Sequence, residues 1–174
     1  MKSLKKGFLF ATLGLLSCIC LIGYFYIKWD KVGIDEGLKK NITYTTFKEE
    51  LNEIPQTTNL EAESIFSPYK CSIYDHKYYL EINFRIGDGF SGGGYNIHVV
   101  KNRYKISEYS YTDNPSSSKP ESSIKVIKSE LKLDKSTYKK GEYAYGYLDF
   151  KIQHTYSSET YIDEGRGYFK AIVK

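Results

Sequence analysis

Cysteine and histidine are scarce in this sequence. Of the three cysteines among the 174 residues, Cys18 and Cys20 lie in an apolar run near the N-terminus. Only Cys71 remains in the rest of the chain, so no disulfide can form there within one chain. We expect Cys71 to be a half-buried thiol, the alternative being a pairing between two chains. The three histidines are far apart, and no two have the spacing of metal ligands, so we predict no metal site and no cofactor.

The chain beyond residue 29 lacks the large excess of positive charge that binding to a nucleic acid requires. The first 29 residues carry four lysines and no acid, whereas residues 30–174 carry 21 basic and 21 acidic side chains. Residues 67–174 alone hold 17 basic and 13 acidic side chains. Such a small excess does not neutralise a run of phosphates, which argues against nucleic acid as a partner.

A long uncharged run marks the N-terminus. Residues 7–27 contain no charged side chain and follow three lysines. As a helix, 21 residues span roughly 30 Å, which is the thickness of a bilayer's hydrocarbon core. Tyr24, Tyr26 and Trp29 follow at its end, where amphipathic aromatic rings favour the membrane interface. We therefore predict that residues 1–29 are an N-terminal membrane anchor formed by one transmembrane helix.

Two alternatives for this run remain open. The sequence from Leu15 to Cys18 is similar to a bacterial lipobox, in which Cys18 would be the lipidated residue. A cleaved signal peptide is the other alternative. The composition looks bacterial, and a short basic N-terminal tail is usually the cytoplasmic end. In all three cases we expect the C-terminal domain to lie outside the cytoplasm, in the bacterial cell envelope.

Residues 30–66 have the composition of a linker. Thr46 and Glu49 fit a helix capping box, and Pro55 ends the pattern of apolar residues that follows. The sequence predicts a short helix at about residues 46–54, too short to persist in water unless it docks on another part of the protein.

Residues 67–174 show the period of β-strands. Apolar residues alternate with polar ones over residues 80–86, and again over residues 143–152, where Gly146, Leu148 and Phe150 share one face. Short strands separated by turn residues, with no room for helical crossovers, indicate an all-β fold. We predict an antiparallel Ig-like sandwich, with a small barrel as the alternative.

Tyrosine is abundant in this domain. Fifteen of the 18 tyrosines follow residue 66. A tyrosine ring can cover a strand surface while its hydroxyl faces water, which explains the excess without a specific function. The alternative is a binding face for a partner, formed by Tyr143, Tyr145 and Tyr147.

The stretch GDGFSGGG, residues 87–94, matches two catalytic or cofactor motifs in form. A dinucleotide loop and a nucleophile elbow both require a following helix, but residues 95–100 have the composition of a strand. We interpret this stretch as a glycine-rich connection between antiparallel strands. Phe90 and Tyr95 would be its partner-binding residues.

The segment LDKSTYKKGEYAYGYLDFKI, residues 133–152, resembles a segment of bacterial Ig-like sandwich domains. This resemblance implies that Tyr138, Gly141 and Glu142 shape the turn before a strand. More loosely, the N-terminal run, the glycine stretch and residues 111–114 together are similar to small uncharacterised envelope proteins of Bacteroidota-type bacteria. The resemblance implies a location and a fold but no reaction.

These observations favour a membrane-anchored binding or interaction module over an enzyme. An immunity protein against a toxin that acts at the envelope is a second hypothesis. A small hydrolase that uses Ser91 or His98 is a third, and it would require a histidine, Ser91 and an acid to meet in space. Asp113 and Asp163 we expect to be acids in turns, with calcium binding as the alternative role.

Overall fold

The computed structural model describes residues 2–44, 60–62, 69–87, 90–113, 122–156 and 159–174. Within these ranges the chain forms two helices and ten strands. In chain order they are α1 Lys2–Ile27, β1 Asp30–Lys31, β2 Gly33–Ile34, α2 Leu38–Tyr44, β3 Glu61–Ala62, β4 Lys70–His76, β5 Tyr79–Gly87, β6 Ser91–Val100, β7 Arg103–Thr112, β8 Ser122–Leu133, β9 Tyr143–Tyr156 and β10 Glu159–Ile172.

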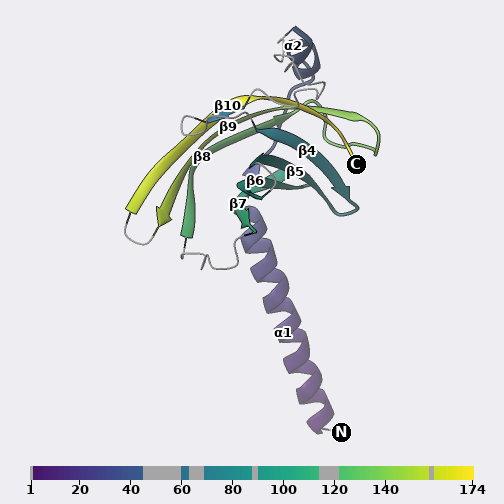
Figure 1. Cartoon of the computed structure of the whole chain (residues 1–174). Coiled ribbons are helices and arrows are strands. Elements are labelled where there is room, and N and C mark those ends of the chain that lie inside the picture. Colours follow the sequence, from purple (N-terminus) through teal and green to yellow (C-terminus); the bar gives the residue numbers. More distant parts are fainter. Residues whose placement is uncertain (1, 45–59, 63–68, 88–89, 114–121, 157–158) are drawn as a thin grey trace.

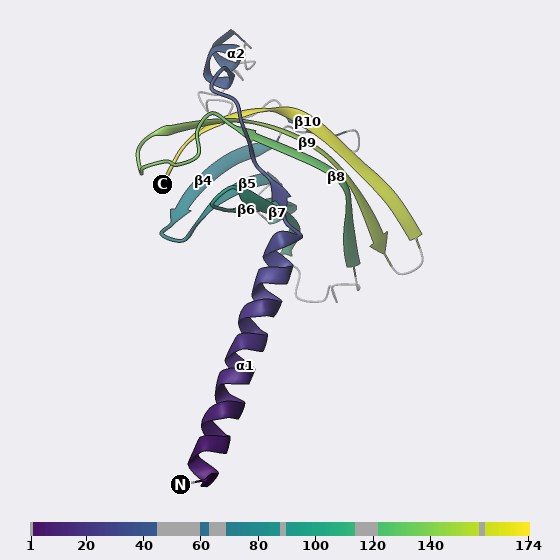
Figure 2. The same ribbon diagram turned by 180° about the vertical axis from the view of Figure 1, so that it is seen from behind.

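The strands form two five-stranded sheets that face each other. Sheet A has the order β1-β7-β6-β5-β4, and sheet B has the order β2-β8-β9-β10-β3. Every pair of neighbours is antiparallel except β2 and β8, which are parallel. Sheet B arches over sheet A, with α2 on its outer side, while α1 leaves the sandwich on the side of sheet A (Figures 1 and 2).

The predicted all-β sandwich is confirmed at this level. The described strands remain in two sheets and do not close into the small barrel that was the alternative. The finer Ig-like assignment is not confirmed. Strands β4 to β7 are hairpin neighbours in chain order, as are β8 to β10, whereas Ig sandwiches have Greek-key connections between their sheets.

The predicted alternation is visible in the burial of the strands. On β5, Ile82 and Phe84 are buried between the sheets, while Glu81 and Asn83 are on the opposite face. The same pattern on β9 buries the face that carries Phe150. Because successive side chains in a strand point to opposite faces, each strand contributes every second residue to the core.

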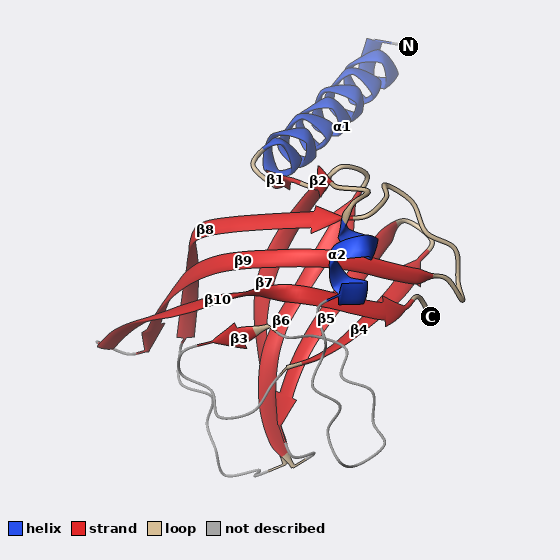
Figure 3. Ribbon diagram, turned by 90° about the horizontal axis from the view of Figure 1, so that it is seen from above, coloured by secondary structure: helices blue, strands red, loops and turns tan. Residues whose placement is uncertain are grey.

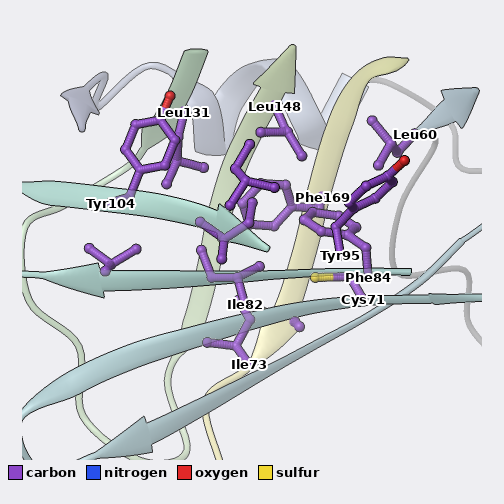
Figure 4. Close-up of a cluster of buried hydrophobic side chains, with 14 of the residues drawn as sticks. Leu60, Cys71, Ile73, Ile82, Phe84, Tyr95, Tyr104, Leu131, Leu148 and Phe169 are labelled. Carbon is purple, nitrogen blue, oxygen red and sulfur yellow. The ribbon is translucent and has the colours of Figure 1, made fainter. Parts of the chain in front are cut away.

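The centre of the core is an aromatic contact between the sheets. Figure 4 shows Phe84 of sheet A and Phe169 of sheet B close together. Their ring centroids are 5.2 Å apart at an interplanar angle of 86°, which is the preferred edge-to-face geometry. Gly146 lies under the second ring, since a Cβ atom there would be 2.1 Å from Cζ of Phe169. The glycine therefore makes room for the ring.

The segment predicted to be a linker contributes to both sheets. Residues 30–31 form β1 beside β7, and residues 33–34 form β2 beside β8. Residues 38–44 form α2, a helix that was not predicted from the sequence. The helix expected at residues 46–54 lies outside the described residues.

The turn before β9 is built by the residues that the Ig-like resemblance implied. The hydroxyl of Tyr138 donates a hydrogen bond to Oδ1 of Asp134 (2.6 Å). The backbone of Gly141 has a φ of 87°, a conformation that glycine adopts without strain. Oε2 of Glu142 accepts a hydrogen bond from the backbone N–H of Lys139 (3.2 Å). These contacts hold the chain in place as it enters β9.

Helix α1 includes the whole uncharged run of residues 7–27. The side chains of residues 2–11 and of Leu13 lie outside the description. Over the part of the chain that the structure does describe, no helix has the combined length and apolarity needed to cross a membrane.

Candidate functional sites

The glycine stretch forms the β5–β6 hairpin, as predicted. Gly87 pairs with Gly92, and Gly94 pairs with Arg85. Gly87 and Gly94 have φ values of 142° and 153°, which side chains other than hydrogen disfavour. A Cβ atom at Gly94 would also lie 1.8 Å from the backbone oxygen of Phe84. These two glycines are therefore required by the backbone geometry, and strand β6 follows where a nucleotide loop would need a helix.

The two residues predicted as partner contacts in this hairpin differ in their exposure to solvent. Phe90 has an exposed fraction of 73% and lies in the connection between the strands. Tyr95 is only 3% exposed, and its ring packs 4.8 Å from Phe150 and 6.2 Å from Tyr69. The prediction that Tyr95 meets a partner is corrected, because position 95 falls on the inward face of β6.

The tyrosine face of β9 is partly covered by the chain itself. Tyr143, Tyr145 and Tyr147 share the outer face of sheet B, as the alternation predicted. Helix α2 packs its two buried residues, Leu38 and Ile42, against Tyr145 and Tyr147. Tyr143 lies beyond this contact and is 50% exposed, so it is the member of the set that a partner can reach most easily.

A polar cluster that was not predicted from the sequence lies between the sheets. His154 of β9 and Asp163 of β10 are 3% and 6% exposed. The hydroxyl of Tyr95 donates a hydrogen bond to Oδ2 of Asp163 and lies 3.3 Å from Nε2 of His154. Nδ1 of His154 lies 3.3 Å from Oε2 of Glu108. Three buried groups thus satisfy one another between the sheets, and the more exposed Glu108 closes the cluster at its rim.

This cluster keeps its tyrosine protonated. Burial raises the pKa of Tyr95, and the hydrogen bond to Asp163 raises it further. The pKa of the neighbouring Tyr69 is also raised, first by burial and then by the charges of Asp163 and Glu108. A phenol held in this way donates a hydrogen bond but does not act as a nucleophile near neutral pH. Asp163, expected in a turn, instead lies in a strand and accepts this bond.

Alternation along β9 is the signal that could have placed His154. Phe150 and Ile152 face the core, so residue 154 falls on the same inward face. A similar count along β10 places Asp163 inward, two residues before Gly165. Nothing local to either strand shows that both side chains reach the hydroxyl of Tyr95 from the other sheet.

The residues of the hydrolase hypothesis do not form a site together. Ser91 and His98 are seven residues apart on β6, which separates them by roughly 23 Å, and their side chains are on opposite faces. His98 contacts Tyr79 instead, with ring centroids 5.4 Å apart. Within the described residues, no group of three histidines, cysteines or acids could hold a metal ion.

The cysteines have different environments. Cys71 is 3% exposed, so the expected half-buried thiol is fully buried, and burial raises the pKa of its thiol. A buried, protonated thiol is a poor partner for a disulfide with a second chain. Cys18, the candidate for lipidation, is exposed on α1.

The C-terminal end of α1 is held by the β6–β7 hairpin. The guanidinium of Arg103 donates hydrogen bonds to the backbone oxygens of Ile27 (2.8 Å) and Trp29 (2.7 Å). The hydroxyl of Tyr26 donates a bond to the backbone oxygen of Val100 (3.0 Å). A cation at a helix C-terminus is also favoured by the helix dipole. The helix is therefore joined to sheet A by side chains as well as by the chain.

Large apolar side chains on α1 face outward. Leu15, Leu16, Ile19 and Ile22 have exposed fractions of 64%, 58%, 57% and 70%, and Phe25 has 61%. At 100° per residue these five positions cover about half of the circumference of the helix, and Leu21, Tyr24 and Ile27, which are 53%, 54% and 67% exposed, lie on the other half. A helix that is apolar all round is normally covered by protein or by lipid.

No protein-family model matches the sequence, and searches of curated proteins and of solved structures gave no match either.

Proposed function

With no relative to supply a function, we propose that this protein is an interaction module of the bacterial cell envelope. In this proposal α1 anchors the chain in a membrane, and the sandwich lies outside the cytoplasm. The observation that carries the proposal is the set of large apolar side chains exposed around α1. In water, such a surface costs roughly 25 cal/mol for each Å² left uncovered, whereas lipid would cover it at no such cost.

The junction between α1 and the sandwich supports this role. The hydrogen bonds from Arg103 hold the sandwich against the end of the helix. A domain fixed in this way would stay close to the membrane surface. Tyr24 and Trp29, near the same end of the helix, are suited to the membrane interface.

The β5–β6 hairpin is the surface that we propose for a protein partner. It lies at the end of β6 that is remote from α1, since the ten residues Ser91–Val100 separate it from the junction by about 30 Å. Figure 3 shows the strands of sheet A running away from the α1 end. Phe90, with an exposed fraction of 73%, would supply the aromatic anchor that interfaces favour.

A charge placed on α1 tests the membrane anchor. Arginine in the centre of a membrane helix costs at least about 2.5 kcal/mol per residue. We expect the variant Leu16→Arg, Ile19→Arg to lose carbonate-resistant association with bacterial membranes. Ile127→Arg, on an exposed position of β8, is the matched control and should remain associated. Retention of the double variant in the membrane would refute the anchor.

Crosslinking in native membranes tests the partner site. Phe90→Ala should lose a stoichiometric partner that the wild-type protein captures. Ile172→Ala, which truncates another exposed apolar residue, should keep that partner. A toxin as the captured protein would identify the immunity role. Equal capture by both variants would refute the hairpin as the contact site.

A further inference from the structure

The outer face of sheet A is basic near α1. Two cross-strand rows are closest to the junction. One contains the pair His76 and Tyr79 and, beyond the last β5–β6 pair of Leu80 and Val99, the set of Val100, Arg103 and Lys31. The other runs from Tyr74 through Glu81 and His98 to Lys105. The β4–β5 and β6–β7 turns add Lys77 and Lys101. We call these rows and turns the basic face, and its five cations are Lys31, Lys77, Lys101, Arg103 and Lys105.

Negative charge is nearly absent from the basic face. Glu81 is the one carboxylate among the described residues of its two rows, and Oε2 of Glu81 lies 3.1 Å from Nε2 of His76. Asp30 is adjacent in sequence to Lys31 but turns away, because its carboxylate accepts a hydrogen bond from Ser129 of sheet B. Lys31, Lys77, Lys101 and Lys105 are exposed. The surface therefore presents positive charge to whatever lies opposite it.

Aromatic rings accompany these cations. Tyr78, in the β4–β5 turn, is 78% exposed, which is the highest value among the exposed apolar and aromatic side chains described. Tyr79 stacks on His76 with ring centroids 4.7 Å apart. Tyrosines beside lysines are the combination found where proteins meet the headgroup layer of a bilayer.

The basic face and α1 lie on the same side of the sandwich. Helix α1 extends from the sheet A side and α2 covers the opposite side in both views (Figures 1 and 2). The backbone N–H of Val32 donates to the oxygen of Asn102 (2.9 Å), which joins the segment after α1 directly to the β6–β7 turn. If α1 enters a membrane, the headgroup layer is the first surface that these lysines meet.

We propose that the basic face docks on the anionic phosphate headgroups of the phospholipid bilayer. This inference rests on the proposed anchoring by α1, and it adds a lipid specificity and a fixed orientation of the sandwich. Each lysine or arginine close to an anionic membrane favours association by about fivefold. The four exposed lysines of this face would hold sheet A against the bilayer, while Arg103 remains on the backbone oxygens at the end of α1. Sheet B and α2 would then face away from it.

Lysine acylation in reconstituted vesicles tests the docking. The full-length protein is incorporated into two kinds of vesicle. One is made of phosphatidylcholine alone, and the other also contains roughly 30% phosphatidylglycerol, which gives it a negative surface potential. Reactivity of Lys77 and Lys105 towards an amine-reactive ester is measured by mass spectrometry and compared with that of exposed Lys140. We expect Lys77 and Lys105 to react several-fold more slowly in the anionic vesicles alone, and 0.5 M salt to restore their reactivity, since the Debye length then falls to about 4 Å.

Charge reversal provides the matched variants. Lys101→Glu, Lys105→Glu should restore the reactivity of Lys77 in anionic vesicles, whereas Lys139→Glu, Lys140→Glu should leave Lys77 protected. Equal protection in neutral and anionic vesicles would overturn the headgroup recognition. Absence of protection in protein that still floats with the vesicles would overturn the docking while leaving the anchor intact. Protein that does not float would overturn the anchor and the docking together.

Discussion

The interior and the outer faces of the sandwich use tyrosine in different ways. Inside, Tyr95 and Tyr104 each place the hydroxyl on a specific partner, namely Asp163 and Ser129, and the half-buried Tyr138 in the turn before β9 does the same with Asp134. Outside, the rings cover one another or a cation. Tyr147 packs on Tyr168 with ring centroids 5.2 Å apart, and the guanidinium of Arg85 lies 4.9 Å from the ring of Tyr111.

The difference follows from the cost of burying a hydroxyl. An unpaired hydroxyl in the core costs about 1–3 kcal/mol, so a buried tyrosine is favoured where a neighbouring group supplies an acceptor. An outward tyrosine can use water or an exposed side chain as its partner, as Tyr111 does with Arg85, and it contributes through the area of its ring. A tyrosine therefore acts inside the sandwich through the specific hydrogen bond of its hydroxyl, and outside it through the surface that its ring covers.

Alkaline pH should separate the two classes most strongly. Burial raises the pKa of Tyr104 to about 12 and raises the pKa values of Tyr69, Tyr95 and Tyr138 as well. In the unfolded chain these groups lose their protons near pH 10, while the folded protein keeps them. The contribution of these tyrosines to the free energy of unfolding should therefore be fully present below pH 10 and should be lost above it. For four tyrosines the slope is on the order of 5 kcal/mol per pH unit.

Urea unfolding of the detergent-solubilised protein at pH 8 to 11.5 measures this effect. Tyr104→Phe should reduce the slope above pH 10 by about 1.4 kcal/mol per pH unit, which is the contribution of one tyrosine. The outward substitution Tyr74→Phe serves as the control, since it removes a hydroxyl from the outer face. A free energy of unfolding that stays level up to pH 11.5 would contradict the assignment of the inward class.

Gly94→Ala should give the next largest effect, because it disturbs the strand that turns Tyr95 inward. The added Cβ atom would meet the oxygen of Phe84 at 1.8 Å, and the φ of 153° is strained for alanine. We expect a loss of at least about 3 kcal/mol in the free energy of unfolding. In Gly141→Ala the φ of 87° is also strained but no atom lies within 4 Å, so the loss should be nearer 1–2 kcal/mol. Equal losses would show that the close approach at Gly94 has no energetic weight.

Tyr95→Phe tests the hydroxyl itself. The ring and its packing on Phe150 would remain, while Asp163 would lose a buried donor. We expect a loss of about 1–3 kcal/mol at neutral pH, which is the cost of an unsatisfied buried group. The double variant Tyr95→Phe, Asp163→Asn should recover part of that loss, because it removes the charge that has lost its donor. Unfolding curves identical to those of the wild type would show that the cluster does not contribute to the free energy of unfolding.

Ile42→Glu should have the smallest effect on global stability, because it acts on the outer face alone. The substitution places a charge between α2 and the tyrosines of β9, and a helix of seven residues does not persist without docking. We expect hydrogen exchange of residues 38–44 to approach that of an unprotected segment, with a loss of only about 1 kcal/mol in global unfolding. Lys39→Glu, on an exposed position of α2, is the control. Unchanged protection in Ile42→Glu would show that α2 does not depend on the tyrosine face.

Several parts of the fold could be read from the sequence because they depend on local patterns. The alternation over residues 80–86 and 143–152 identified the inward faces of β5 and β9. The glycines at residues 87–94 indicated a strand-to-strand connection, and the structure shows why Gly87 and Gly94 must lack a side chain. The phase of β6 could also be read, because Ile97 and Val99 alternate with Asn96 and His98 and share their face with Tyr95. The wrong expectation of an exposed Tyr95 arose because that residue was assigned to the glycine-rich connection instead of to the strand.

The sequence by itself determined an N-terminal helix, an all-β domain and the residues that β5 and the first part of β9 turn inward. Only the tertiary structure decided that residues 30–34 join both sheets, that α2 covers Tyr145 and Tyr147, and that Glu108, His154 and Asp163 meet around Tyr95. The physical reason is the range of the interactions. Period and turn propensity act between residues near in sequence, whereas the register between sheets brings together side chains from strands that are far apart along the chain.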